Sequence, residues 1–307
     1  MRDRLGAWRL VALLSVALSV GCRPTLDDRP WLVTRPQIIG LKASSPEVRP
    51  GTAVTFEVVA LDPAGPVDTS PTTWAFCGMP KPPAEANVVA PACLTPAAPD
   101  ATGSPVSLTV PVDACELFGP DTPQPAPGEP PSRPADPDAT GGYYQPIAID
   151  LSESVAVGLE RVTCDLPQAS LDAARAFQAA YTANVNPMIS ELAVTLSGAD
   201  IDPAAVPAGA SVQIAVSWPA GSAESFALYD RTTASVVETQ ETLTAAWFVT
   251  GGDLDRAATE VTDSMVLSAA ATWTAPGQPG PVQLAVTLRD SRGGMDAMTM
   301  SLSIVAP

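Results

Sequence analysis

The side chains whose type and spacing could support chemistry are cysteines, aspartates and tyrosines, because the chain contains no histidine. Without an imidazole, Ser-His-Asp and Cys-His catalysis and histidine-ligated metal sites are excluded. Glycoside hydrolysis by paired carboxylates stays an open alternative, since 33 acidic residues bring carboxylates together by chance in any fold. No pair stands out among them, and we predict a protein without enzymatic activity.

The candidate metal ligands are Asp136, Asp138 and Thr140, in the run Asp-Pro-Asp-Ala-Thr-Gly-Gly. This spacing matches the opening of a calcium loop, in which carboxylate and hydroxyl oxygens ligate the cation. The closing position holds Ile147, where such a loop needs a bidentate glutamate. A turn rich in Asp, Pro and Gly explains the same residues. Calcium is therefore kept as an alternative, and otherwise no cofactor is expected.

Two adjacent tyrosines, Tyr143 and Tyr144, are the candidate ligand-binding aromatics, because an exposed ring can stack on a sugar. They begin a segment that alternates as a strand, so one of the two must face outward and the other inward. Core packing explains the inward ring. The tryptophans Trp218 and Trp247 fall on the buried faces of their own strands.

Four cysteines remain beyond the N-terminal one, namely Cys77, Cys93, Cys115 and Cys164. In an exported protein an even number of cysteines indicates two disulfides, for which three connectivities exist. We favour Cys77 with Cys93, which closes a short loop, and Cys115 with Cys164, which would clamp the proline-rich stretch between them.

The N-terminus has the pattern of a signal peptide over residues 1–21. Arg2, Arg4 and Arg9 precede an apolar run from Leu10 to Gly21, which is too short to span a bilayer. Residues 22–35 are then expected to form a tether before the first folded domain.

The segment Leu18-Ser19-Val20-Gly21-Cys22 resembles the lipobox of bacterial lipoproteins. The resemblance implies lipidation of Cys22, and several acyl chains would anchor the protein stably to a membrane without spanning it. By the same resemblance, Arg23 in place of an aspartate favours the outer membrane. The sequence departs from the family at Ser19, where leucine is usual, so ordinary cleavage near Gly21 stays open.

An internal repeat organises the rest of the chain. The run Val48 to Val58 corresponds to Val206 to Val216, and both end in segments of period two. A Trp-containing segment follows in each half, at Thr73–Phe76 and Ala246–Val249. Each half then closes with two long alternating segments, residues 142–150 and 155–164 in the first, 280–290 and 297–304 in the second. Alternation of this kind predicts antiparallel strands with one buried face.

These segments resemble immunoglobulin-like modules of bacterial surface proteins, especially the PKD type, and the nearest match is Val286-Thr-Leu-Arg-Asp290. The resemblance implies two antiparallel β-sandwiches, over residues 36–166 and 187–307. It departs from the PKD pattern after each tryptophan, where Gly-Asp-Gly is missing. The immunoglobulin-like sandwich is therefore the expected fold, and the fold alone implies no activity.

Two segments lie outside the repeat. Residues 119–142 hold eight prolines and are expected to form an exposed insertion in the first domain. Within the connecting segment 167–186, Ser170 is a capping residue, and the apolar residues at helical spacing are Leu171, Ala174, Phe177 and Tyr181. They predict a short helix whose apolar stripe packs on one sandwich, with binding of a partner as the alternative.

The charge balance bears on partners, because 33 acidic and 16 basic residues give a net charge of −17. Such a chain is repelled by phosphate backbones, so nucleic acid is not expected as a partner. Together, the features predict a mainly β, non-enzymatic, lipid-anchored protein of the cell envelope. It would act as an interaction or structural module toward an envelope protein or polysaccharide. The alternative is a glycan- or calcium-binding accessory module.

Overall fold

The computed structural model describes residues 29–80, 89–120, 127–128, 142–152, 154–164, 166 and 169–306. The chain divides into two compact units, Met1–Pro30 and Trp31–Pro307, and all the elements below belong to the second. Cys22 and the aspartates Asp136 and Asp138, with Thr140, lie outside the described residues. No helix within the described ranges is both long and apolar enough to cross a membrane.

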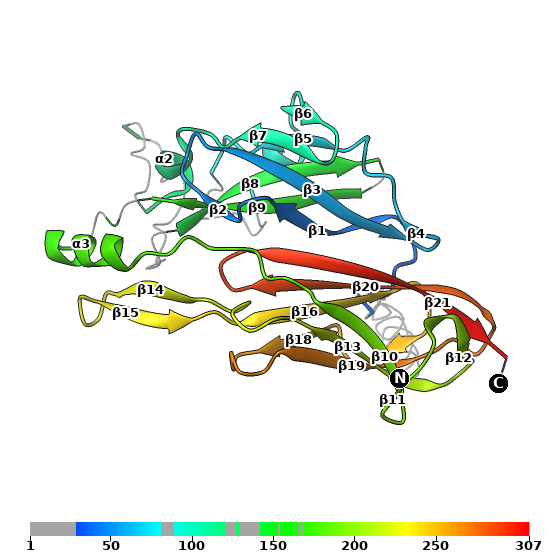
Figure 1. The fold of residues 1–307 in the computed structure, drawn as a ribbon. Coiled ribbons are helices and arrows are strands. Elements are labelled where there is room, and N and C mark those ends of the chain that lie inside the picture. Colours follow the sequence, from blue (N-terminus) through cyan, green and yellow to red (C-terminus); the bar gives the residue numbers. More distant parts are fainter. Residues whose placement is uncertain are drawn as a thin grey trace, which may run out of the picture. The chain divides into compact units, whose positions relative to one another are not determined.

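The first sandwich contains two sheets, which Figure 1 shows in blue to green. One sheet holds β1 (Gln37–Ala43), β3 (Ala53–Asp62) and β4 (Gly65–Pro66), with β7 (Val106–Thr109) also paired to β3. The other has the order β2 (Glu47–Val48), β9 (Ser154–Thr163), β8 (Gly142–Leu151), β5 (Thr73–Phe76) and β6 (Ala101–Thr102).

The alternation along β3 places this sandwich's core. Val54, Phe56 and Val58 are buried, while Thr55 and Glu57 between them are exposed. Phe56 packs against Trp74, with ring centroids 6.0 Å apart. Burying these large side chains is the main favourable contribution to folding, at about 25 cal/mol per Å² of apolar surface.

The second sandwich repeats the plan. One sheet has the order β11 (Ala199–Asp200), β10 (Glu191–Leu196), β13 (Ser211–Ser217), β19 (Ser268–Thr274) and β17 (Asp253–Leu254). The other has the order β12 (Val206–Pro207), β21 (Met295–Val305), β20 (Gly280–Asp290), β16 (Leu243–Val249) and β18 (Ala258–Val261). Its core includes Trp218, Trp247 and Trp273, each at most 3% exposed.

Corresponding strands occupy corresponding places in the two sandwiches. In each, a two-residue strand pairs in parallel with the last strand, β2 with β9 and β12 with β21. One sheet of each half contains β1, β3 and β7 in the first sandwich and β10, β13 and β19 in the second. The other sheet contains the last two strands beside the Trp-bearing strand, namely β9, β8 and β5 in the first sandwich and β21, β20 and β16 in the second. This is immunoglobulin-like strand order. The fold predicted from the sequence, two antiparallel sandwiches joined by a short helix, is confirmed.

The connecting helix, α3, spans Leu171–Ala180. Its N-terminus is capped by the Ser170 hydroxyl, which accepts a hydrogen bond from the Ala173 amide at 3.2 Å, as expected from the sequence. The predicted stripe needs correction, because Leu171 is 65% exposed, whereas Ala173 and Phe177 are buried. The buried residues are four positions apart and so lie on one face.

Several short elements were not predicted. They are the five-residue helix α2 (Ala114–Phe118), the 3₁₀ turns η1 (Pro91–Leu94) and η2 (Pro203–Ala205), and a hairpin of β14 (Ser225–Asp230) and β15 (Ser235–Gln240). The hairpin lies between β13 and β16 in the chain and forms a separate two-stranded sheet, drawn in yellow-green and yellow in Figure 1. Helix α3 contacts both of its strands.

The described end of the predicted tether is packed against the fold. Leu32 forms a parallel bridge with Val249 of β16. The Val33 amide donates to the Val249 carbonyl at 2.8 Å, and the Val249 amide donates to the Trp31 carbonyl at 2.9 Å. The chain therefore contacts the second sandwich before it enters the first.

Candidate functional site: the charged junction between the sandwiches

The charged junction is a cluster of buried side chains centred on Glu47 and Arg292, and it joins the two sandwiches, α3 and the hairpin. Glu47 stands in the two-residue strand β2 and is 5% exposed. Its Oε1 lies 3.1 Å from Arg161 Nε on the paired strand β9, and it accepts a hydrogen bond from the Thr163 hydroxyl at 3.2 Å. The Tyr181 hydroxyl, just beyond α3, donates to the same oxygen.

The second oxygen of Glu47 is bound from the other half of the chain. Oε2 accepts a hydrogen bond from the Asn184 amide at 3.0 Å and lies 3.6 Å from Arg292 Nη1. A buried carboxylate is costly unless its lone pairs are satisfied. Here donors from the first sandwich, the connecting segment and the second sandwich satisfy the Glu47 carboxylate together. The cost of burying this carboxylate is therefore offset in full only when all three parts of the chain are in place.

Arg292 holds the hairpin in the same way. Its Nε donates to Glu241 Oε1 at 2.6 Å and its Nη2 to Glu224 Oε2 at 3.0 Å, and these two glutamates stand at the base of the hairpin. Its Nη1 donates to the Thr182 carbonyl at 2.9 Å, and the guanidinium lies 4.6 Å from the ring centroid of Phe226 in β14. The planar, multi-donor guanidinium suits this task, which an ammonium could not perform with the same geometry.

Asp290 shapes the turn that carries Arg292. Its Oδ1 accepts hydrogen bonds from the Arg292 amide at 2.8 Å, the Gly294 amide at 2.9 Å and the Asn184 side-chain amide at 3.2 Å. Gly294 is required here, because a Cβ at that position would overlap the Asp290 carboxyl. The turn between β20 and β21 is thereby fixed to the connecting segment.

The junction holds more acidic than basic groups, and burial raises the pKa of several carboxyls. Burial, and then the negative charge of Asp290, raises the pKa of Glu241 to about 7, against the opposing effect of its bonds to Glu224 and Arg292. Burial also raises the pKa of Asp290, although its hydrogen bonds oppose the shift. Desolvation destabilises the charged form of each acid, and two guanidinium groups do not balance the acids fully.

Glu160, next to Arg161 in β9, has a strongly raised pKa. Burial, and then the charge of Glu47, raises its pKa to about 9. Its side chain is 1% exposed, and its cross-strand neighbour is Gln145. Among the described residues no hydrogen-bond partner meets Glu160 Oε1. The raised pKa favours the protonated form of Glu160 at neutral pH, and protonation converts one of its acceptors into a donor.

An apolar contact between the sandwiches accompanies the charged junction. Val33, Ile39, Leu61 and Ala285 form a buried cluster, against which Val59 and Phe248 pack. Gly40 of β1 allows close approach, because a Cβ there would overlap the Met295 side chain. Ala285 and Phe248 belong to β20 and β16, so the outward face of one sheet of the second sandwich is covered by residues of the first.

Polar contacts continue along β1. Lys42 Nζ lies 2.6 Å from Asp296 Oδ1, and Arg289 Nη2 donates to the Ile39 carbonyl at 3.3 Å. The Asn186 side chain bridges the two sandwiches, because its Nδ2 donates to the Ala43 carbonyl at 2.7 Å while its Oδ1 accepts from the Met295 amide at 2.9 Å. The junction and these contacts together couple the two sandwiches.

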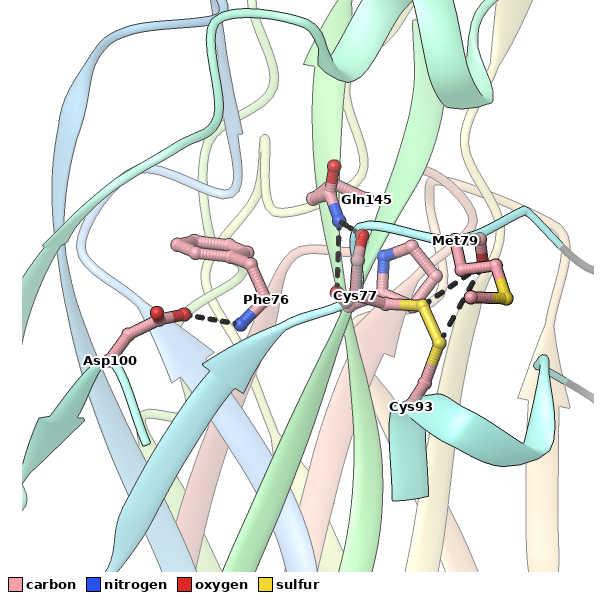
Figure 2. The surroundings of a disulfide bond; sticks show 7 residues. Phe76, Cys77, Met79, Cys93, Asp100 and Gln145 are labelled. Carbon is pink, nitrogen blue, oxygen red and sulfur yellow. Dashed lines mark hydrogen bonds between the residues drawn. A yellow bond between two sulfur atoms is a disulfide. The ribbon is translucent and has the colours of Figure 1, made fainter. Parts of the chain in front are cut away.

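The structure contains both disulfides in the favoured pairing, Cys77–Cys93 and Cys115–Cys164. Figure 2 shows the first, with Gln145 donating to the Cys77 carbonyl at 2.7 Å and the Met79 carbonyl oxygen 3.1 Å from the Cys77 sulfur. The same view shows the Asp100 carboxylate accepting from the Phe76 amide at 2.7 Å. The disulfide thus fastens the η1 loop to the end of β5.

The candidate tyrosines have different surroundings. Tyr143 is the inward member and is 1% exposed in the core of the first sandwich. The Tyr144 hydroxyl accepts a hydrogen bond from Arg161 at 3.4 Å, and the guanidinium lies 5.7 Å from the ring centroid. Tyr144 also lines a cavity of about 370 Å³ with Ile39, Leu41 and Arg289 among its other walls. The pair therefore does not form a shared stacking platform.

Other predicted chemistry cannot be placed in the structure. The candidate calcium ligands Asp136, Asp138 and Thr140, and the lipidation site Cys22, lie outside the described residues. Among the described residues, no group of three Cys, Asp or Glu side chains is arranged to hold a metal ion. The side chains of Glu47, Glu160 and Glu241 are buried, so they are closed to a substrate in this conformation.

Sequence reasoning did not find the charged junction. One available signal was the pair Glu160-Arg161 inside a predicted alternating strand, since alternation directs one of two adjacent charged residues inward. Glu241 and Arg292, both at turns, carried no such signal.

Comparison with known proteins gave only distant likenesses. No family model matches the chain, and no curated protein matches it. Among solved structures, the D00-D0 domain of intimin is 8% identical, with 87% of this chain and 100% of that chain covered at a TM-score of 0.25. Domains 4 and 5 of the S-layer protein SbsC are 10% identical, covering 88% and 100% at a TM-score of 0.21. The Yersinia pseudotuberculosis adhesin InvE is 12% identical, covering 86% and 58% at a TM-score of 0.22. At these scores the likeness carries no argument, and the fold assignment rests on the strand order.

Proposed function

We propose that the chain is a non-enzymatic, lipid-anchored protein of the cell envelope whose two sandwiches act as one interaction module. The observation that carries the proposal is the charged junction, in which Glu47 and Arg292 bind groups from both sandwiches. The charged groups of the junction bind one another across the domains and are not presented to solvent, since Arg292 and Glu241 are at most 2% exposed. A fixed pair of sandwiches presents a constant surface to a partner, which lowers the conformational cost of binding.

Two further observations support the envelope location. The two disulfides are of a kind that persists in oxidising, exported compartments. The lipobox-like segment ending at Cys22 supplies the anchor, with Arg23 favouring the outer membrane. In the sequence, eight residues, 23–30, separate Cys22 from Trp31, whose carbonyl is hydrogen-bonded to the Val249 amide.

Fractionation of cells expressing Cys22→Ser tests the anchor. The unmodified protein should sediment with membranes and partition into detergent, whereas Cys22→Ser should move to the soluble fraction because it cannot be acylated. Cys115→Ser, a cysteine of the folded body, is the matched control and should stay with the membranes. Retention of Cys22→Ser in the membrane fraction would show that anchoring does not depend on this residue.

Crosslinking in the native envelope tests the interaction role. Crosslinks from one envelope protein, concentrated on one surface of the chain, are the expected result. Recovery of polysaccharide without an enriched protein would replace this role with the glycan-binding alternative.

A further inference from the structure

The β14–β15 hairpin is the one two-stranded sheet among the described elements. Its six pairs run from Ser225 with Gln240 to Asp230 with Ser235, without a register shift. No other described strand pairs with either of its edges. An isolated two-stranded sheet is marginally stable in water, so this one depends on the contacts that hold it.

Those contacts fix the base and one side of the hairpin. The Glu224 backbone amide donates to Glu241 Oε2 at 2.8 Å, and the side-chain Nε2 of Gln240 donates to the Ala223 carbonyl at 2.7 Å. Arg292 donates hydrogen bonds to both glutamates at the base of the hairpin, and α3 contacts both strands. The hairpin is therefore held in place before any partner arrives, which removes part of the entropic cost of binding.

The register shows which backbone amides and carbonyls of β15 do not form hydrogen bonds to β14. The Glu241 amide donates to the Glu224 carbonyl at 2.9 Å, so residues 224 and 241 form a hydrogen-bonded pair. Hydrogen-bonded and non-hydrogen-bonded pairs alternate along an antiparallel ladder. The amides and carbonyls of Val236, Glu238 and Gln240 therefore point away from β14.

Several of the usual protections are missing from this edge. Residues 235–240 contain no proline or lysine, and the ladder has no bulge. The edge strands β11, β12, β17 and β18 of the second sandwich are only two to four residues long, whereas β15 has six. Val237 is 38% exposed and Glu238 is also exposed, while Ala227 and Tyr229 of β14 are buried. β15 is thus the more exposed of the two strands.

We propose that the β15 edge binds an extended segment of a partner protein, which adds as a third strand and places a lysine or arginine against Glu238. Strand addition satisfies the outward amides and carbonyls of β15. Basic character follows from charge complementarity, because the chain carries 33 acidic and 16 basic residues and Glu238 stands in the middle of the edge. The inference rests on the proposed interaction role and names the surface that performs it.

The test uses phage-displayed random peptides of about twelve residues, selected on the full chain in detergent micelles. Enriched peptides should carry basic residues and no internal proline. On binding such a peptide, hydrogen exchange at single-residue level should slow at the amides of residues 236, 238 and 240. Residues 235, 237 and 239 are protected by β14 beforehand and should change little. This alternation is specific to strand addition.

Substitutions separate the backbone from the charge. Val236→Pro removes an outward amide without breaking the hairpin ladder and should weaken peptide binding about tenfold or more, whereas Val236→Thr keeps that amide and should bind within about threefold of wild type. Glu238→Gln should weaken binding at low salt and have less effect at high salt. Because the exchange pattern is read on the unmodified chain, the test does not depend on Val236→Pro folding.

Each other outcome overturns the proposal. Peptides that protect a different surface would leave the interaction role standing but exclude the β15 edge. The absence of any binding peptide would exclude strand addition, while Cys22→Ser fractionation judges the anchor independently. Concentration-dependent dimers that Val236→Pro abolishes would show that a second copy of this chain, not a basic partner, occupies the edge.

Discussion

Replacing Glu160 by glutamine should make the free energy of unfolding less dependent on pH. Burial and the charge of Glu47 raise the pKa of Glu160 from 4.5 to about 9. The unfolded chain loses this proton near the lower value, and the folded chain keeps it until the higher one. The stability contributed by this group is therefore fully present below the unfolded pKa and is lost as pH rises toward the folded pKa.

The size of the effect follows from the shift. Between the two pKa values, each pH unit lowers the free energy of unfolding by about 1.4 kcal/mol. From about pH 7 to about pH 8.5 the wild type should lose about 2 kcal/mol that Glu160→Gln retains. Glutamine has nearly the shape of the neutral acid and does not titrate. Glu241, whose pKa is raised to about 7, is present in both proteins, so the comparison cancels its contribution.

Urea unfolding at these two pH values, followed by tryptophan fluorescence, measures the difference. When the dependence of the free energy of unfolding on urea is the same in both proteins, the shift in urea midpoint gives the change in that free energy. Glu238→Gln removes an exposed glutamate in β15 and is the matched control, which should follow the wild type. Equal losses in wild type and Glu160→Gln would refute the reasoning, because they would mean that Glu160 ionises in the folded protein near its ordinary pKa.

Two further predictions concern the charged junction and the two disulfides. Arg292→Met should lower the free energy of unfolding by about 3 to 5 kcal/mol, because Glu241 stays buried without its cation and Glu47 keeps only Arg161; Arg292→Lys should cost less, and thermal unfolding that finds no loss in Arg292→Met would contradict the role of the junction. Removing the Cys115–Cys164 disulfide, with a separation of 49 residues, should cost about 4 kcal/mol, against about 3 kcal/mol for Cys77–Cys93 with 16. Denaturant titrations of the paired alanine variants that reverse this order would argue against loop-closure entropy as the cause.

The sheets could be predicted because their signals are local. Val54, Phe56 and Val58 alternate within one strand, and burial of one sheet face is enough to produce that pattern. The same reasoning placed Trp247 in the core, where it is fully buried. The repeat then carried strand order from one half to the other.

The charged junction could not be predicted, because its partners are distant in the sequence. Arg292 meets Glu224 and Glu241 only after β20 and β21 have paired, and it meets Glu47 only when the two sandwiches contact each other. Composition alone assigns such residues to the solvated surface. The β14–β15 hairpin was missed for a different reason, since the comparison of the two halves passes over a segment that the first half lacks.

The packing of Trp31 to Val33 on the second sandwich has a mechanical consequence. A pull that enters the chain from the N-terminal side reaches the two hydrogen bonds between these residues and Val249 before it reaches β1. Tension is therefore applied first to β16, a central strand flanked by β18 and β20. Within the described part of the chain, a pull from the N-terminal side therefore meets the second sandwich, through β16, before it meets the first strand of the first sandwich.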